Sequence, residues 1–166
     1  DYNKALQHLK QAEQILLQVY GEEHPDLDMV YSVQGNIFLE KGETDKALKV
    51  FKDALKFAEE TYEPEHPHLS TNYLNIARAL LEKGDYSAAV EMAEKAYEID
   101  LKVQNEAHPK LGRDLSLKGL ILAQQEKYKE AIALQQQALQ IFENQAMLSK
   151  DDIGTAYYRL SYSYLK

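Results

Sequence analysis

The chain has 166 residues, of which 45% are apolar, with a net charge of −8 and no cysteine. Its length suffices for a buried core. The absence of cysteine excludes disulfides and thiolate metal sites. The negative net charge argues against nonspecific nucleic-acid binding, which needs Lys and Arg. No apolar run approaches the length of about 18 residues that crosses a membrane, and we expect a cytoplasmic protein.

The first 20 residues form the first predicted element, a helix with apolar residues at three- and four-residue spacing. Because this helix already begins at Tyr2 and no initiator Met precedes it, we expect the chain to be a piece of a longer protein. Ala, Leu, Gln, Glu and Lys dominate the remaining sequence, which favours an all-α fold.

After this helix the sequence repeats with a period of 42 residues, and each unit opens with His-Pro, at His24, His66 and His108. Proline suits the first turn of a helix, where its missing N–H costs nothing. Each unit therefore consists of a first helix that starts at His-Pro, named helix A, and a second helix, named helix B. The predicted B helices are Thr44–Thr61, Tyr86–Val103 and Tyr128–Gln145.

Small residues recur where the two helices of a hairpin would cross, and helices approach to about 8–10 Å only where the contact positions carry little side chain. They are Gly35, Ala77, Gly119 and Ser161 in helix A, and Ala47, Ala89 and Ala131 in helix B. Gly42 and Gly84 stand where a left-handed residue ends a helix. Glu126 replaces the third of these glycines, which allows that turn to end differently.

In chain order the elements are one B helix, three A–B hairpins and one A helix. We expect a single array over residues 1–166, an all-α, right-handed superhelix (α-solenoid) of antiparallel helix hairpins with about eight helices, because each hairpin buries its apolar face only against its neighbours. The parts of the array are residues 1–20, 24–62, 66–104, 108–146 and 150–166.

The pattern of bulky, small and aromatic residues in the two helices resembles the tetratricopeptide repeat. In the second unit, the residues that carry the resemblance are Tyr73, Ile76, Ala77, Leu80, Ala89 and Ala96. A 42-residue unit opened by His-Pro is similar to the repeats of kinesin light chains. The resemblance implies a protein-binding module whose A helices line a concave groove. The sequence has no Gly-rich phosphate loop, nucleophile elbow or metal-ligand pair at helical spacing, so we expect no enzymatic activity, cofactor or metal.

Carried over residue by residue, the resemblance implies a peptide-binding groove formed by Ser32, Asn36, Thr71, Leu74, Asn75, Arg78, Arg113, Ser116, Leu120, Tyr158 and Tyr162. The asparagine that faces the cargo peptide in kinesin light chains is kept at Asn75, while Val33, Leu117 and Arg159 stand at the equivalent positions. Tyr158 and Tyr162 are i,i+4 neighbours, and we expect either an aromatic wall of the groove or plain surface there.

The A helices are close to neutral, with basic points at Arg78 and Arg113, and the rest of the chain carries the negative charge. We therefore expect a protein or peptide ligand with some acidic character and a large apolar side chain. Two alternatives stay open. One is a peptide-sensing regulatory domain of a larger signalling protein, and the other is a spacer or scaffold that associates end to end through uncapped terminal helices.

The three histidines at one repeat position raise the question of a metal site. Equivalent positions in successive repeats are roughly 10 Å or more apart at ordinary helix packing distances, whereas metal ligands lie about 2 Å from one ion. We therefore expect His24, His66 and His108 to bond the local backbone at the start of helix A.

Overall fold

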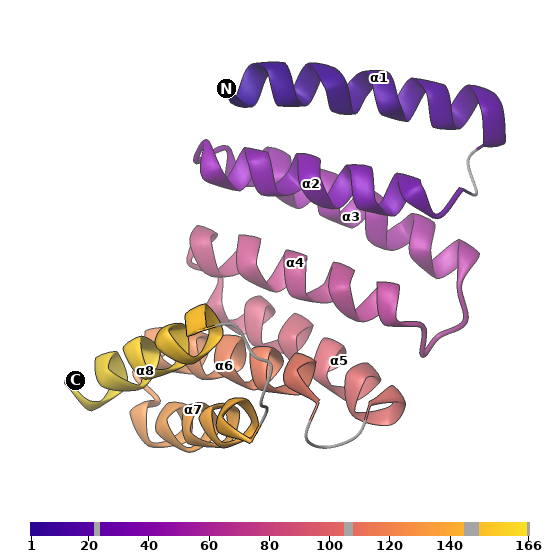
Figure 1. The fold of residues 1–166 in the computed structure, drawn as a ribbon. Helices are drawn as coiled ribbons and strands as arrows, with labels where there is room; N and C mark the ends of the chain where they lie inside the picture. Colours follow the sequence, from indigo (N-terminus) through magenta and orange to yellow (C-terminus); the bar gives the residue numbers. More distant parts are fainter. Residues whose placement is uncertain (22–23, 105–107, 145–149, 166) are drawn as a thin grey trace.

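The computed structural model describes residues 1–21, 24–104, 108–144 and 150–165, and these ranges contain eight α-helices and no strand (Figure 1). The helices are α1 (Tyr2–Tyr20), α2 (Asp26–Glu40), α3 (Thr44–Thr61), α4 (Pro67–Lys83), α5 (Tyr86–Val103), α6 (Pro109–Gln124), α7 (Tyr128–Glu143) and α8 (Lys150–Tyr164). The predicted all-helical fold class and number of helices are confirmed. The predicted segment ends at 146 and 166 lie outside the described residues.

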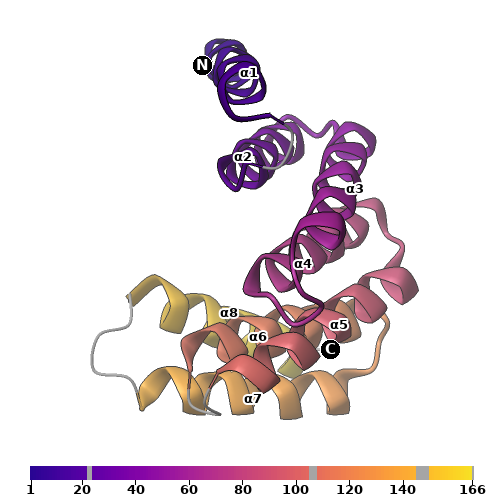
Figure 2. The same cartoon turned by 90° about the vertical axis from the view of Figure 1, so that its right-hand side faces the viewer.

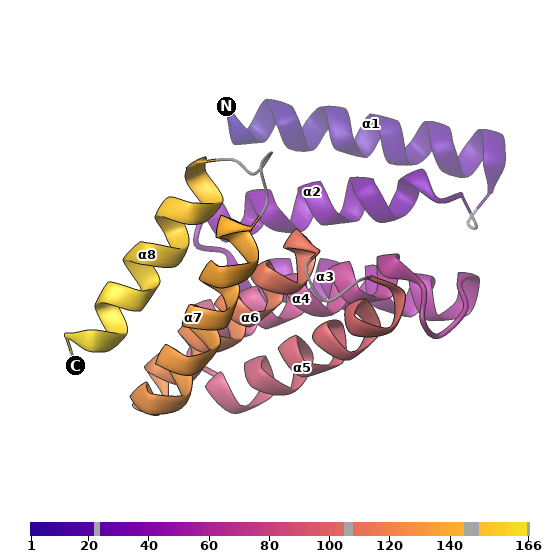
Figure 3. The ribbon, with the colours of Figure 1, turned by 60° about the horizontal axis from the view of Figure 1, so that its bottom comes forward.

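The helices form a solenoid in which each helix packs on the next one along the chain. The A helices α2, α4, α6 and α8 also contact their neighbours of the same kind, so they share one side of the array. In Figure 2, α1 and α2 are seen nearly end-on while α6 to α8 lie across the view, so the helix direction turns along the array. Figure 3 shows α8 running steeply to the direction of α1 and α2. None of the helices described is long and apolar enough to cross a membrane.

Histidine side chains bond the starts of the A helices α2, α4 and α6. The Nδ1 atom of His66 accepts a hydrogen bond from the backbone N–H of His68 at 3.3 Å, and His108 accepts one from Lys110 at 3.2 Å. The same bond recurs at His24. Each histidine satisfies a backbone donor that has no partner inside its helix. The prediction that these histidines serve the local backbone is confirmed.

A left-handed residue follows the A helix in all three hairpins. Gly42 and Gly84 have φ angles of 72° and 82°, and Glu126 has a φ angle of 64°. The third turn closes like the others, since the N–H of Lys127 donates to the carbonyl of Leu122 at 3.0 Å. The expectation that this turn ends differently is therefore wrong. The hairpin packing keeps a glutamate in a conformation that costs about 1 kcal/mol.

The helices of each hairpin cross where the small residues stand. A Cβ atom at Gly35 would lie 2.2 Å from the Phe51 ring, and one at Gly119 would lie 3.1 Å from the carbonyl oxygen of Ala131. At Gly35 the Phe51 ring occupies the space that a side chain would need, and at Gly119 the side chain of Gln135 and the backbone of α7 do so. Ser161, at the equivalent position of α8, is exposed.

The two ends of the array are covered less than its middle. No residue of α1 is buried, and α1 packs only on α2 among the described helices. Val19 and Tyr20 of α1 are exposed, as are Tyr157 and Tyr164 of α8. The apolar core therefore lies between α2 and α8, around the hairpin crossings.

Candidate functional site on the inner face

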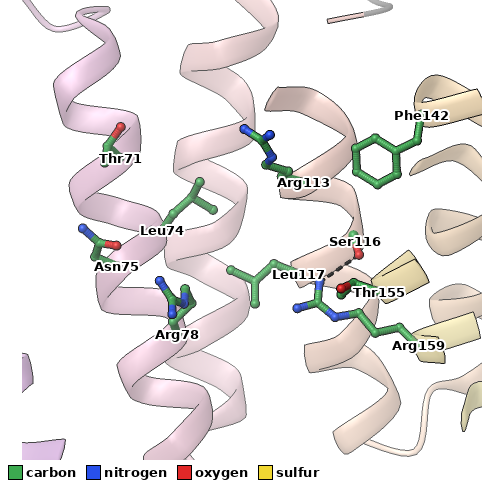
Figure 4. Close-up of a pocket in the computed structure, with 10 residues that line it drawn as sticks. All are labelled: Thr71, Leu74, Asn75, Arg78, Arg113, Ser116, Leu117, Phe142, Thr155 and Arg159. Atoms are coloured by element: carbon green, nitrogen blue, oxygen red, sulfur yellow. Dashed lines mark hydrogen bonds between the residues drawn. The ribbon is translucent and has the colours of Figure 1, made fainter. Parts of the chain in front are cut away.

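A cavity of about 350 Å³ lies between the A helices α4, α6 and α8 (Figure 4). Its lining residues are Thr71, Leu74, Asn75, Arg78, Arg113, Ser116, Leu117, Phe142, Thr155 and Arg159. All of them except Phe142 come from A helices, so three successive repeats contribute to one surface. An extended segment that crosses the repeats can contact all three.

The predicted groove residues that line this cavity are Thr71, Leu74, Asn75, Arg78, Arg113 and Ser116. Their spacing explains why they gather there. Residues three and four apart lie on the same face of a helix, and the four residues from α4 form one such row. Arg113 and Ser116 form the corresponding pair on α6.

Ser32, Asn36 and Leu120 lie next to the cavity rather than in it. Asn75 Nδ2 donates to Ser32 Oγ at 3.3 Å, and an Nη of Arg78 donates to Asn36 Oδ1 at 3.3 Å. Leu120 lines an adjoining hollow of about 400 Å³ that also borders Arg78. These three residues extend the inner face beyond the cavity.

Tyr158 and Tyr162 do not line the cavity. The side chain of Tyr158 is exposed, with 71% of the residue accessible to solvent, whereas Tyr162 packs on the buried residues Leu122, Ala123 and Ala131. The two rings therefore form no wall toward the other predicted groove residues.

Contacts between neighbouring A helices explain why Arg159 of α8, rather than Tyr158, lines the cavity. A residue in one A helix contacts the residue 43 positions later, as Ser32 does with Asn75 and Ser116 with Arg159. Tyr158 stands one repeat after Ser116, so it points beyond α8, which is the last A helix described.

Leu117, Phe142 and Arg159 line the cavity although the sequence-based prediction omits them. Leu117 and Arg159 occupy the repeat position of Asn75, so the 42-residue offset was a signal that identifies them. Phe142 comes from α7 and reaches the cavity beside Gly112, where a Cβ atom would lie 2.5 Å from its ring. No pattern within helix A points to Phe142.

Among the side chains that the structure describes, the lining includes three arginines and no acidic group. An Nη of Arg159 donates to Ser116 Oγ at 2.8 Å. The pKa of the Arg159 guanidinium is lowered, first by burial and then by the positive charge of Arg78. The two cations therefore repel each other across a space that is only partly solvated.

A buried polar cluster joins α4, α5 and α6. Lys110 Nζ donates to Asp100 Oδ1 at 2.9 Å and to Ser70 Oγ at 2.7 Å, and Ser70 Oγ donates to Asp100 Oδ1 at 2.7 Å. Asp114 is fully buried next to Asp100, and burial together with the Asp100 charge raises the pKa of its carboxyl to about 8. The cluster fixes the start of α6, the helix that carries Arg113.

The junction between α2 and α4 has its own buried polar group. Asp28 Oδ1 accepts a hydrogen bond from Asn72 Nδ2 at 2.7 Å, and Asp28 Oδ2 lies 2.7 Å from His68 Nδ1. Asp28 precedes Ser70, and His68 precedes Lys110, by one period. Polar contacts therefore join successive A helices at the same repeat positions. In the described ranges, no three His, Asp or Glu side chains gather as a metal site requires.

Two models of the tetratricopeptide repeat match the sequence, one over residues 1–60 and 35–102 and the other over residues 74–146. No curated protein matches it.

Several solved structures share the fold. BtubC (BKLC) from P. vanneervenii superposes with a TM-score of 0.87 at 21% identity, over 99% of this chain and 66% of that one. The kinesin light chain TPR-like repeats of Podosopora anserina superpose with a TM-score of 0.77 at 20% identity, over 99% and 78%. The apo form of RapI gives 0.77 at 19% identity, over 99% and 44%. This chain thus spans 66% of the length of BtubC, and the likeness concerns the fold.

Proposed function

This chain belongs to the tetratricopeptide repeat family, whose arrays generally mediate protein–protein interaction, and from that premise we propose that it holds a segment of a partner protein in the cavity between α4, α6 and α8. The observation that supports this is the origin of the lining, since side chains of three successive A helices face one space. A single bound segment can therefore contact three repeats at once.

The chemistry of the lining suits a peptide. Leu74, Leu117 and Phe142 offer apolar contact, while Asn75 and Thr71 offer hydrogen-bonding groups. An extended or helical segment needs pockets for its side chains and partners for its main chain. Our proposal is a ligand with a large apolar side chain and some acidic character. A non-catalytic role in the cytoplasm is part of the same proposal.

The proposal is tested with peptides selected from a random display library against the wild-type chain. Leu74→Ser should weaken the binding of selected peptides at least tenfold, because it removes an apolar contact inside the cavity. Leu17→Ser is the matched control, since Leu17 is an exposed leucine on the B helix α1. Peptides that bind both variants as tightly as the wild type would place the binding surface outside this cavity.

End-to-end self-association is a second candidate, favoured by the exposed apolar side chains at both ends of the array, such as Val19 on α1 and Tyr164 on α8. Sedimentation velocity over a wide concentration range measures it, and Val19→Glu should abolish any oligomer. A chain that stays monomeric throughout would remove this candidate. A peptide-sensing regulatory role would use the same cavity and differ only in the domain attached to the array.

A further inference from the structure

A second hollow, of about 500 Å³, lies on the side of the B helices, between α5, α6 and α7. We call it the outer hollow. Leu101 of α5 and Ile141 of α7 line it, and α6 contributes the buried side chain of Leu115. None of its described lining residues also lines the cavity between α4, α6 and α8. The two spaces are therefore separate, and a ligand of one need not touch the other.

The neighbouring repeats show what fills the equivalent space elsewhere in the array. Tyr73 stands one period before Leu115, and its hydroxyl donates to Glu59 Oε1 of the B helix α3 at 3.1 Å. Tyr157 stands one period after Leu115, and its hydroxyl donates to Glu143 Oε1 of the B helix α7 at 2.7 Å. In both repeats a tyrosine from helix A thus reaches a glutamate of the preceding B helix.

The third repeat lacks both members of this pair. Leu115 stands in place of the tyrosine, and Leu101 stands in place of the glutamate. A leucine side chain is shorter than that of tyrosine, so the outer hollow lies where the other repeats hold a phenol ring. The space therefore has the place and the apolar lining that a phenol ring requires, but the repeat supplies no ring of its own.

The rim of the outer hollow has lost its charges as well. In the preceding repeat Lys95 lies over the Tyr73 ring, with its Nζ atom 5.5 Å from the ring centroid. The charged residues of α5 at the rim positions are replaced by amides on α7, namely Lys95 by Gln137, Glu98 by Gln140, and Lys102 by Asn144. Amides donate and accept hydrogen bonds without charge. An uncharged ligand suits this rim, because the described lining offers a buried charge no partner.

We propose that the outer hollow binds an aromatic side chain from an uncharged segment of a partner protein, and that this ring takes the place that Tyr73 fills one repeat earlier. Aromatic rings contribute large apolar contact areas at binding surfaces. The amides at the rim are then available to the hydroxyl of a tyrosine or to the main chain of the segment. This site goes beyond the proposed function, since it lies on the other side of the array and takes a different ligand.

The test titrates p-cresol, the side chain of tyrosine as a free molecule, into the chain with ¹³C-labelled leucine and isoleucine methyl groups. A bound aromatic ring shifts the NMR signals of nearby methyl groups. We expect saturable shifts at Leu101, Leu115 and Ile141, and no comparable shift at Leu74 or Leu117 of the inner cavity. The anion 4-hydroxyphenylacetate should shift these three signals with an affinity lower by roughly fivefold, because the described lining carries no cation.

Variants rebuild the features of the neighbouring repeats. Leu115→Tyr should fill the hollow and abolish the p-cresol shifts at Leu101 and Ile141. Leu101→Glu restores a charge on an exposed side chain, so it should keep the fold and weaken p-cresol by roughly fivefold. Leu17→Glu makes the same change at the same repeat position of α1 and should leave the binding of p-cresol unchanged. Thermal melts check the fold of each variant, and Leu101→Glu decides the matter if Leu115→Tyr does not fold.

The outer site would be overturned if p-cresol shifts the signals of Leu74 as strongly as those of Leu101. Undiminished binding to a folded Leu115→Tyr or to Leu101→Glu would overturn it as well. Methyl shifts that follow the protein concentration alone would assign the hollow to a second copy of this chain and retract the partner segment.

Peptides from the random display library extend the test to the partner. Peptides that lose binding to Leu101→Glu but keep it to Leu74→Ser should carry Tyr or Phe between uncharged residues. Peptides of this class with charged flanks, or without an aromatic residue, would contradict the proposed chemistry. Dependence on Leu74 reports the inner cavity and dependence on Leu101 the outer hollow, so the failure of either proposal leaves the other standing.

Discussion

Asp114 lies beside Asp100 within the interface of α5 and α6, and both residues are fully buried. Lys110 brings one positive charge to this pair through its hydrogen bond with Asp100. Burial and the charge of Asp100 raise the pKa of the Asp114 carboxyl to about 8, and the positive charges of Lys110 and Arg113 offset this rise only in part. Asp114 therefore keeps its proton at neutral pH.

The first prediction concerns the dependence of stability on pH. Between about pH 4 and pH 8 the folded protein holds a proton on Asp114 that the unfolded chain releases, so the free energy of unfolding falls as the pH rises through this window. Asp114→Asn removes the carboxyl group, so the variant releases no proton at this position when it unfolds. We expect the variant to exceed the wild type in stability at pH 8 by on the order of 1–3 kcal/mol, as thermal melts over this range measure.

Asp53→Asn is the matched control for Asp114→Asn, because Asp53 is an exposed aspartate of α3. It should leave the dependence of stability on pH as in the wild type. A stability profile that Asp114→Asn leaves unchanged would contradict the assignment of the proton to this residue.

The second prediction concerns the ammonium group in the same cluster. Lys110→Met should destabilise the fold by about 3 kcal/mol, because it leaves the carboxylate of Asp100 buried without its cation. Denaturant titration measures the loss. Lys102→Met breaks an exposed ion pair with Glu65 and should cost less than about 1 kcal/mol. Equal losses in the two variants would argue against a special role of the buried pair.

The third prediction tests the close approach of α2 and α3. Gly35→Ala should destabilise the fold by about 1–3 kcal/mol, because the new methyl group would lie 2.2 Å from the Phe51 ring and must displace it. Gly154→Ala places a methyl group on α8, where no atom lies within 4 Å, and should stabilise the helix by about 0.5–1 kcal/mol. Thermal denaturation compares the two, and a neutral Gly35→Ala would refute the tight crossing.

The fourth prediction tests the turn after α6. Glu126→Gly should raise the free energy of unfolding by about 0.5–1 kcal/mol, because glycine adopts the φ angle of 64° without the clash that an L side chain meets. The converse change, Gly84→Ala at a φ angle of 82°, should lower stability by a similar amount. If Glu126→Gly is destabilising instead, the glutamate side chain must contribute more than its backbone conformation costs.

Much of the fold follows from the sequence because one structural unit recurs. The bounds predicted for α3 and α5 agree with the structure, since Gly42 and Gly84 mark the turns before them and the apolar spacing marks their length. The expectation for the turn at Glu126 is wrong because packing, rather than residue preference, sets the backbone conformation of this residue. Local sequence patterns thus predict each helix. Whether a turn can hold a residue in an unfavourable backbone conformation depends on how the hairpin around it packs.

The site is less accessible to prediction because it depends on how neighbouring repeats meet. Arg78 and Ser116 lie on the inner face as their repeat positions imply. Tyr158 shares the repeat position of Ser116, yet only Ser116 has a further A helix beside it among the described residues. The sequence does not predict the burial of Asp114 either, because the equivalent position in the preceding repeat carries Asn72 and no acidic residue recurs there.

The thin attachment of α1 has a consequence for how the molecule opens. With no buried side chain and a single neighbouring helix, α1 is tied to the rest through one interface. In a solenoid, stability passes only between adjacent units, so α1 can fray while the helices beyond α2 stay closed. Backbone amides should then exchange fastest in α1 and slowest in α4 to α6. Fraying at the amino-terminal end should therefore leave the cavity between α4, α6 and α8 intact, because none of its described lining residues belongs to α1 or α2.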